Sequence, residues 1–169
     1  MTEIRKEEPR DQASVRGVNM AAFESGPEAA LVDELRVSCE DYLAFVAVED
    51  GIVVGHILFT PVTVDGCEVV GMGLAPMAVL PPYQHKGIGS QLIRHGLAQL
   101  HHSGCPFVIV LGHPGYYPRF GFELASKYQL SSQWESVPDE AFMVVIYDGG
   151  VLPKAGSVVR YRDEFNDAI

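Results

Sequence analysis

The sequence predicts a single α/β domain in which helices flank a mixed, mostly antiparallel sheet. Two observations predict this class. Three apolar stretches at 42–48, 52–64 and 67–80 are separated by tight-turn signals, of which Asp50-Gly51 is the clearest, and they indicate an antiparallel meander. A continuous apolar run at 106–111 then follows a helical pattern, which indicates a βαβ unit with parallel pairing. The length of 169 residues and the apolar content of 47% suit one domain with a sizeable core.

A short strand and two helices precede this meander. Ile4 belongs to the first strand, and Pro9 opens a helix whose apolar residues continue to Phe23. Ser25 and Gly26 then interrupt the pattern. Either of them is a suitable N-cap for a second helix with a proline in its first turn.

The region after the apolar run carries two tyrosines on a predicted short helix. Pro114 suits the first turn of this helix, which carries Tyr116 and Tyr117, and Gly121 is suited to end it in the left-handed conformation.

The last part of the chain is less regular. Residues 123–141 are expected to form a surface loop packed by Trp134, and residues 141–147 a strong strand. Residues 148–169 are expected to be a C-terminal extension with a possible edge strand, so that the core covers about residues 4–147 of one domain spanning 1–169.

The stretch from Leu74 to His102 carries the strongest functional signal. An apolar strand ends at two consecutive prolines, a loop with Gly87 and Gly89 follows, and a helix then begins. The N–H groups at the start of a helix lack partners within the helix, and the helix dipole adds partial positive charge there. Glycine lets a bulky anion approach the main chain closely. These features predict a site for a phosphate or pyrophosphate.

Two motifs resemble those of the GCN5-related N-acetyltransferases (GNAT). Gln84-x-x-Gly87-x-Gly89 is similar to the family's Gln/Arg-x-x-Gly-x-Gly/Ala signature, and the segment from Tyr117 to Phe122 is similar to its later Tyr-x-x-x-Gly-Phe marker. Details such as His113-Pro114-Gly115 look most like the YhbS-like branch of predicted acetyltransferases. The resemblance implies the GNAT fold, with a twisted sheet of roughly six or seven strands and parallel pairing at the splayed strands around the acetyl-CoA site.

The resemblance also implies roles for individual residues. The main chain of Met77, Ala78 and Val79 would pair with the pantetheine arm of acetyl-CoA, and Gln84 would shape the loop. Tyr117 would be the general acid that protonates the departing thiolate, with Tyr116 as the alternative donor. The loop amides that would hold the pyrophosphate are those of His85, Lys86, Gly87, Ile88, Gly89 and Ser90.

No side chain is identified as the general base with the same directness. Some family members carry a glutamate near the position of Gly73, whereas here the glycine suggests a bulge or the close approach of another segment. His113 is a candidate base or acceptor contact. Glu24, His56 and Glu68 are weaker candidates, and an ordered chain of water molecules is equally open. We interpret His56 first as a buried histidine of the sheet.

The resemblance implies an N-acetyltransferase that moves the acetyl group of acetyl-CoA to a primary amine by direct attack in a ternary complex. A covalent acyl-enzyme is not expected, because no Cys or Ser has a recognisable base partner. The alternative function is a non-catalytic module on the same fold that binds or senses acyl-CoA. We expect a small-molecule or peptide amine as the acceptor, and a monomer or homodimer.

Composition weighs against several other classes of function. A net charge of −10 makes nucleic acid an improbable partner. The apolar runs are far shorter than a membrane span, and the charged first residues do not resemble a signal peptide, so the cytoplasm is the expected compartment. Three distant cysteines argue against a disulfide framework or a zinc site, and no metal is expected.

Overall fold

The computed structural model describes residues 1–24 and 26–167, which form two compact units. The first unit comprises Met1–Phe59, Ala75–Ala98 and Asp163–Ile169, and the second comprises Thr60–Leu74 and Gln99–Arg162. The expectation that the whole chain acts as one domain stays a prediction. Each unit is described below by itself.

The described strands form a mixed, mostly antiparallel sheet, as expected, but with nine strands rather than the six or seven of the prediction. Hydrogen bonds link them in the order β1-β2-β3-β4-β5-β8-β6, and β9 pairs with both β3 and β7. Their bounds are β1 Thr2–Lys6, β2 Leu43–Glu49, β3 Ile52–Val64, β4 Val70–Val79, β5 Phe107–Leu111, β6 Glu123–Leu124, β7 Leu130–Ser132, β8 Phe142–Ile146 and β9 Ser157–Arg160.

In the first unit, β1, β2 and the first half of β3 form the predicted antiparallel layer. Ile4 lies opposite Ala47 in β2, and Phe45 lies opposite Ile57 in β3. The hairpin between β2 and β3 turns at Asp50-Gly51, where both residues take positive φ values of 51° and 77°. This conformation matches the right-handed twist of the flanking strands, which is why Asp-Gly is a strong hairpin signal.

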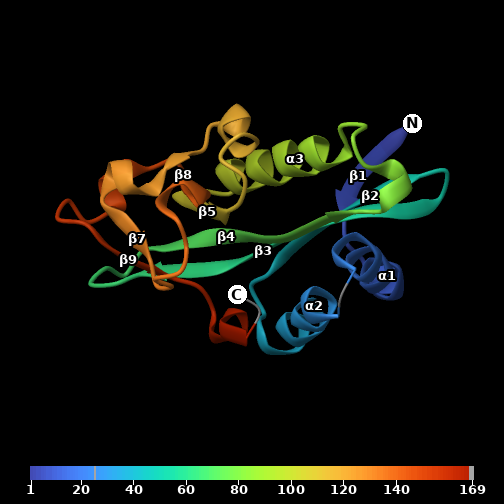
Figure 1. Ribbon diagram of the computed structural model, residues 1–169, viewed down its shortest axis with the longest axis horizontal. Helices are drawn as coiled ribbons and strands as arrows, with labels where there is room; N and C mark the ends of the chain where they lie inside the picture. Colours follow the sequence, from blue (N-terminus) through green and yellow to red (C-terminus); the bar gives the residue numbers. More distant parts are fainter. Residues whose placement is uncertain (25, 168–169) are drawn as a thin grey trace. The chain divides into compact units, whose positions relative to one another are not determined.

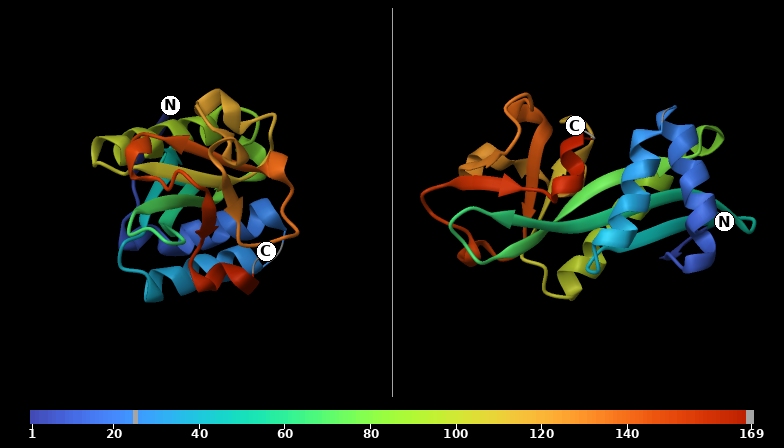
Figure 2. Two further views of the ribbon diagram at one scale, coloured as in Figure 1. Left: turned by 90° about the vertical axis from the view of Figure 1, so that its left-hand side faces the viewer. Right: turned by 90° about the horizontal axis from the view of Figure 1, so that it is seen from below.

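Helices cover both faces of this layer. After the short 3-10 helix η1 (Pro9–Asp11), helices α1 (Gln12–Phe23) and α2 (Pro27–Ser38) lie side by side on one face, and α3 (Ile88–His102) lies on the other (Figures 1 and 2). Gly26 is the N-cap of α2, whereas Ser25, the other predicted cap, lies outside the described residues.

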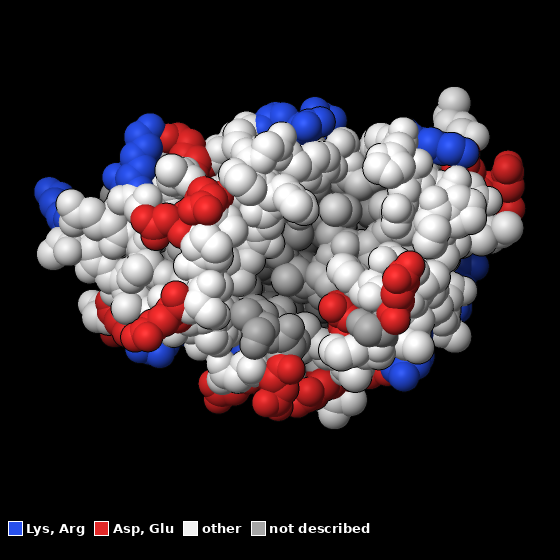
Figure 3. All heavy atoms as spheres, in the orientation of Figure 1, with Lys and Arg blue, Asp and Glu red and all other residues white. Residues whose placement is uncertain are grey.

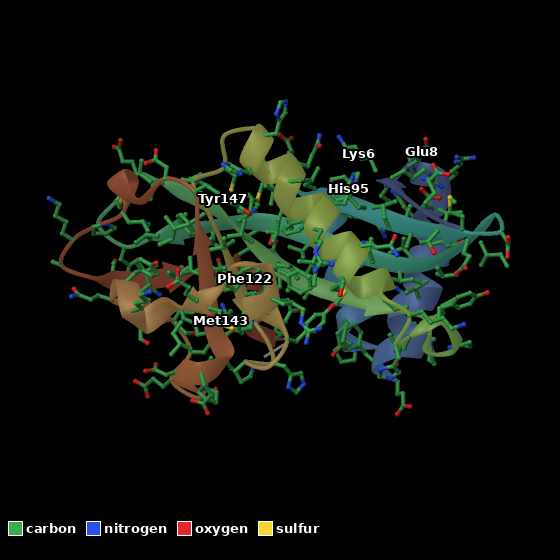
Figure 4. The ribbon with its side chains drawn as sticks, turned by 90° about the horizontal axis from the view of Figure 1, so that it is seen from above. Lys6, Glu8, His95, Phe122, Met143 and Tyr147 are labelled. Atoms are coloured by element: carbon green, nitrogen blue, oxygen red, sulfur yellow. The ribbon has the colours of Figure 1, made fainter. Side chains whose placement is uncertain are left out.

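Neighbouring residues of β3 show why this strand can support helices on both sides. A Cβ at Gly55 would lie 3.1 Å from the Leu92 side chain of α3, whereas the next residue, His56, contacts Asn19 of α1. Helix α3 also packs against β2, where the His95 ring lies 4.8 Å from that of Phe45 (Figure 4). Successive side chains of a strand point to opposite faces, which explains this arrangement.

In the second unit, β5 is paired on both sides. It runs parallel to β4 over three residue pairs, from Met72–Val108 to Leu74–Val110, and antiparallel to β8 along its whole length. The predicted parallel pairing is therefore confirmed. Phe122 and Met143, both labelled in Figure 4, are buried in the core of this unit.

The short helix that carries the tyrosines begins later than predicted. It is a 3-10 helix, η3 (Tyr117–Phe120), and Pro114 lies in the turn before it. The backbone N–H groups of Tyr116 and Tyr117 both donate to the His113 carbonyl, at 3.1 and 3.3 Å, so one shared carbonyl closes the turn before η3. Gly121 ends the helix in the left-handed conformation, as expected, with φ at 96°.

Two predictions about the last third of the chain are wrong. Residues 123–141 are not a loop, since they contain β6, β7 and two 3-10 helices, η4 (Ala125–Tyr128) and η5 (Asp139–Ala141). The C-terminal strand β9 is not an edge strand, because it pairs with β3 on one side and β7 on the other. Strands of two to four residues are too short to show an alternating pattern in the sequence. Two more 3-10 helices, η6 (Gly149–Val151) and η7 (Asp163–Asp167), flank β9.

Candidate functional site

The loop between β4 and α3 turns through left-handed backbone conformations. After the 3-10 helix η2 (Pro81–Tyr83), His85 and Gly87 have φ values of 64° and 84°. A Cβ at Gly87 would meet no atom within 4 Å, so glycine is favoured there by the backbone conformation rather than by crowding. Gly87 also accepts the first backbone hydrogen bond of the helix, from Gln91 at 3.1 Å. The loop therefore leads directly into the N-terminus of a long helix.

The same loop is exposed on its outer side and anchored on its inner side. His85, Lys86 and Gly87 are exposed, whereas Ile88 is buried. The Gln84 amide donates a hydrogen bond to the Val79 carbonyl at 2.9 Å, which ties the loop to the end of β4. N–H groups in the first turn of a helix have no carbonyl partner within their own helix, and the dipole favours an anion beside them. This arrangement suits a phosphate group.

Cationic charge lies at the same loop. The Lys86 ammonium is 5.6 Å from the centre of the Tyr83 ring, a cation–π contact that holds the lysine beside η2. On the strand before the loop, Met77 is half-buried, and the side chains of Ala78 and Val79 are buried. The predicted donor-binding residues of the loop and of β4 therefore all lie in the first unit.

Tyr117, in the second unit, is buried among aromatic rings. Its side chain is 8% exposed, and its ring lies 5.7 Å from that of Phe122 and 5.2 Å from that of Tyr116. A Cβ at Gly112 would lie 2.2 Å from the Tyr117 ring, so this ring packs directly on the backbone after β5. The sequence marks Tyr117 by its motif but gives no sign of this close contact with Gly112.

Burial changes the acid–base properties of Tyr117. Burial first, and then the neighbouring Tyr116, raises the pKa of the phenol from the ordinary value of 10.0 to about 12. The hydroxyl therefore remains protonated throughout the physiological pH range. Such a group donates a hydrogen bond or a proton, and it does not act as a base.

The candidate bases differ strongly in their surroundings. His113 is exposed, and its carbonyl accepts the two hydrogen bonds of the tyrosine turn. Glu24 and Glu68 are also exposed. His56 is fully buried, as expected, and burial followed by the charge of Arg36 lowers its pKa to about 3. His56 therefore belongs to the core of the first unit.

Two groups of residues were missed in the sequence. The first surrounds Gly73, where a Cβ would lie 2.9 Å from the ring of Tyr161 and 2.9 Å from Val62. This close approach confirms the interpretation of Gly73, although only the fold could reveal that the neighbour is Tyr161. A side chain such as glutamate has no room at this position.

The second missed group is a buried polar cluster in the first unit, made of Glu7, Asn19, Arg36 and His56. Arg36 forms an ion pair with Glu7, and Asn19 Nδ2 lies 3.3 Å from His56 Nδ1. Asn19 Oδ1, Arg36 Nε and His56 Nε2 have no hydrogen-bond partner among the described residues. The four residues come from distant parts of the chain, so no local pattern signals them.

Other kinds of site find no support among the residues that the structure describes. No cluster of three or more His, Cys, Asp or Glu side chains is placed to hold a metal ion. None of the helices in these ranges has the length and apolar character needed to cross a membrane. On the face that Figure 3 draws, the basic side chains are scattered among acidic ones and form no continuous basic surface.

Comparison with known proteins identifies relatives over nearly the whole chain. Residues 40–124 match the acetyltransferase (GNAT) domain family. The Escherichia coli K12 protein YhbS, described as an N-acetyltransferase, is 37% identical over 164 residues, which cover 96% of this chain and 98% of YhbS.

Two solved structures are similar in fold and sequence. The structure of E. coli YhbS in complex with CoA has a TM-score of 0.90 and 36% identity, and it covers 98% of this chain and 92% of that one. A GNAT family acetyltransferase from Brucella melitensis in complex with acetyl-CoA has a TM-score of 0.81 and 39% identity, with 98% of each chain covered.

Proposed function

Because the chain belongs to the GNAT acetyltransferase family, we propose that it transfers the acetyl group of acetyl-CoA to a primary amine by direct attack in a ternary complex. The observation that carries this proposal is the exposed loop at 85–87, which turns through two left-handed residues into the N-terminus of α3. The bound CoA and acetyl-CoA in the structures of its two relatives support it.

In this proposal the loop holds the pyrophosphate of acetyl-CoA. The backbone N–H groups of residues 85–90 donate to the phosphate oxygens, and the helix dipole and Lys86 add positive charge. Gln84 keeps the loop in place through its hydrogen bond to Val79. The main chain of Met77, Ala78 and Val79 pairs with the pantetheine arm, which aligns the thioester along β4.

The chemical step requires that the amine and the thioester are held together and that one hydrogen-bond donor faces the departing sulfur. The neutral amine attacks the thioester carbonyl carbon, the C–N bond forms and the C–S bond then breaks, so that the sulfur leaves with negative charge. Tyr117 donates a hydrogen bond to this sulfur, and the proton lost by the amine balances the proton gained by the thiolate. The raised pKa of Tyr117 favours the role of a hydrogen-bond donor that stays protonated over that of a strong acid.

The route by which the amine loses its proton has two candidates. His113 is exposed next to the turn that carries Tyr117, so it can contact an acceptor from solvent. Water that enters with the acceptor is the second route. A pH–rate profile of His113→Gln separates them, because loss of the acidic limb of the profile in this variant would assign the base to this histidine.

For the acceptor, we infer a small-molecule or peptide amine rather than a nucleic acid. The net charge of −10 favours a cationic partner over an anionic one. The cytoplasmic location and the choice between monomer and homodimer stay predictions.

The alternative function, a sensor that binds acyl-CoA without turnover, is favoured by one observation. Gly73 leaves no room for an acidic side chain on β4, because Tyr161 fills that space. A sensor would bind acetyl-CoA and would release no thiol with any amine.

The first test measures binding by isothermal titration with acetyl-CoA and with CoA, followed by thiol release with a panel of primary amines. Binding in the micromolar range together with amine-dependent thiol release supports the transferase. Binding without thiol release from any amine supports the sensor. Absence of binding contradicts both.

A matched pair of variants assigns the binding to the loop. Gly87 and Gly66 both lie in turns with positive φ, 84° and 75°, and a Cβ at either would meet open space. We expect Gly87→Asp to weaken acetyl-CoA binding by at least about tenfold, since its carboxylate repels the pyrophosphate, and Gly66→Asp to leave it unchanged. Equal affinities for the two variants would remove the loop from the proposed site.

A further inference from the structure

Arg119 is exposed in η3, yet its guanidinium contacts the turn that precedes this helix at three points. Nε donates a hydrogen bond to the Tyr116 carbonyl at 2.9 Å, and Nη2 donates to the Gly115 carbonyl at 3.3 Å. The same guanidinium lies 4.7 Å from the centre of the Tyr116 ring, a cation–π contact. One rigid, planar group therefore holds two successive carbonyls of the backbone.

The sequence explains why a side chain is useful at the Gly115 carbonyl. In the i, i+3 pattern of a 3-10 turn the donor to this carbonyl would be the N–H of Pro118, and proline has no N–H. Gly115 has no side chain of its own to pack, and a Cβ there would meet no atom within 4 Å. Arg119 therefore supplies a hydrogen bond that Pro118 is unable to donate.

The hydrogen bond to Tyr116 acts directly on the backbone of Tyr117. The Tyr116 carbonyl and the Tyr117 N–H belong to one planar peptide group. Arg119 Nε donates to the oxygen of this group at 2.9 Å, and its N–H donates to the His113 carbonyl at 3.3 Å. The peptide group is thus held on both sides, immediately before the Cα from which the Tyr117 side chain leaves.

The cation–π contact acts on Tyr117 through the neighbouring ring. The Tyr116 ring lies edge-on to that of Tyr117, with 5.2 Å between their centres, and at the same separation from that of Phe120. Since the guanidinium lies over this ring as well, Arg119 supports both the backbone before Tyr117 and the aromatic packing beside it.

We propose that Arg119 is a positioning residue for the acetyl transfer, which fixes the peptide group before Tyr117 and so directs the Tyr117 hydroxyl toward the departing sulfur. This inference rests on the proposed function. Arg119 acts through Tyr117 and takes no part in proton transfer itself, since a guanidinium keeps its charge in proteins. An exposed arginine adds little to stability, so its effect should appear in turnover rather than in folding.

Kinetics of two variants provide the first test. Arg119→Met removes every donor, and Arg119→Lys retains the charge but replaces the planar fork with a single ammonium group. We expect both variants to lower kcat about tenfold with the KM for acetyl-CoA unchanged, because a small misplacement of the donor lowers the rate steeply. Their melting temperatures should stay within about 4 °C of the wild type.

Two kinetic results would overturn the proposal. A wild-type kcat in Arg119→Lys would show that the charge alone matters and that the fork on the two carbonyls does not. A raised KM for acetyl-CoA with an unchanged kcat would assign Arg119 to donor binding instead.

Lys127→Met is the matched control. Lys127 is an exposed cation of the same unit that also lies near a tyrosine ring, 5.8 Å from the centre of Tyr128. Its replacement removes the same charge as Arg119→Met, and we expect it to leave kcat unchanged. A loss as large as that of Arg119→Met would attribute the effect to net charge and contradict a positioning role.

A double-mutant cycle separates positioning from a general structural effect. If Arg119 acts through the Tyr117 hydroxyl, Arg119→Met has no further effect on kcat in the Tyr117→Phe background. Additive losses in the double variant would show that the two residues act independently, and the proposal would fail.

Nuclear magnetic relaxation of the backbone amides keeps the test independent of turnover. We expect the order parameter of the Tyr117 N–H to be about 0.85 in the wild type, to fall toward about 0.6 in Arg119→Met and to stay unchanged in Lys127→Met. If the wild-type protein releases no thiol with any amine, the acetyl-transfer proposal fails, and this order parameter alone decides whether Arg119 fixes the peptide group. An order parameter that is the same in Arg119→Met and the wild type overturns that role.

Discussion

The Tyr117 ring is held in one position, and its hydroxyl stays protonated. Its ring is held by Gly112 and by the rings of Tyr116 and Phe122, so the hydroxyl has little freedom to turn away. Burial raises its pKa to about 12. A donor held in this way stabilises charge that develops in the transition state without reorganising at that moment.

The pKa of Tyr117 predicts the alkaline side of the pH–rate profile. The phenol loses its proton only near pH 12. We therefore expect kcat to rise with pH as the acceptor amine becomes neutral, and to show no decline at any pH up to about 10.5. The measurement is kcat between pH 6 and 10.5 with saturating substrates. A decline centred between pH 9 and 10 would show that Tyr117 titrates normally or that another acid is required.

Removing the Tyr117 hydroxyl should affect turnover but not donor binding. We expect Tyr117→Phe to lower kcat by about 100-fold, the usual effect of losing one well-placed donor, and to leave the Kd for acetyl-CoA unchanged. Tyr116→Phe is the control, since it removes the neighbouring hydroxyl and retains the ring. A larger loss in Tyr116→Phe than in Tyr117→Phe would transfer the donor role to Tyr116.

At the scale of elements, two helical glycines have opposite surroundings. A Cβ at Gly17 in α1 would meet nothing within 4 Å, whereas a Cβ at Gly96 in α3 would lie 2.4 Å from the Phe59 ring of β3. Glycine inside a helix costs about 1 kcal/mol relative to alanine, so helix propensity alone would favour alanine at both positions.

These surroundings predict stability changes of opposite sign. We expect Gly17→Ala to raise the free energy of unfolding by about 0.5–1 kcal/mol. Gly96→Ala should lower it by about 1–3 kcal/mol, because the added methyl pushes α3 away from β3. Denaturant unfolding of both variants against the wild type measures the difference. A higher free energy of unfolding in both variants would show that α3 can shift away from β3 at little cost.

The buried cluster beneath α1 and α2 makes the first unit sensitive to acid. The pKa of His56 is 6.5 in the unfolded chain and about 3 in the folded one, because burial and then Arg36 disfavour the charged ring. Below pH 6.5 the unfolded state takes up a proton that the folded state does not, so stability falls as the pH falls from 6.5 toward 3. Between pH 7 and 5 the loss from this residue is about 2 kcal/mol.

Comparison with a variant isolates this effect from other titrating groups. Glu7, which also faces the cluster, has a raised pKa from burial, so it opposes the loss in acid. We expect His56→Asn to reduce the change in unfolding free energy between pH 7 and 5 by about 2 kcal/mol. The control is His113→Asn at an exposed position, which should show the same change in unfolding free energy as the wild type. Equal changes in wild type and His56→Asn would contradict the assignment.

The long elements were predictable because each carries a complete local signal. Helix α3 has periodic apolar residues and a glycine loop before it, and the β2–β3 hairpin has Asp50-Gly51 between two apolar strands. Strands β6 and β7 are too short to carry such a pattern. Their existence depends on partners that are distant in sequence, such as Val159, which pairs with Val64 and Ser132.

For the whole molecule, the C-terminal segment is part of the fold. β9 is hydrogen-bonded on both sides, and Val159, Tyr161 and Phe165 are at most 5% exposed. Each buried apolar side chain contributes about 2–4 kcal/mol, so the three together rival the stability of an ordinary domain.

Truncation measures this contribution. We expect a chain ending at Gly156 to lose cooperative thermal unfolding, whereas a chain ending at Asp167 should unfold like the full protein. Circular dichroism and a melting curve distinguish the two. A truncated chain that unfolds cooperatively near the wild-type temperature would show that residues 157–169 are a dispensable extension.

The sequence by itself determined the class of fold, the family resemblance and the candidate binding loop, because each depends on residues close together in the chain. The glycine loop at 84–87 is an example, since the turn and the helix after it follow from local backbone preferences. Only the tertiary structure decided which side chain fills the space at Gly73, that the pKa of Tyr117 is raised and that His56 remains neutral. These properties arise from burial and from contacts between distant segments, which local patterns do not encode.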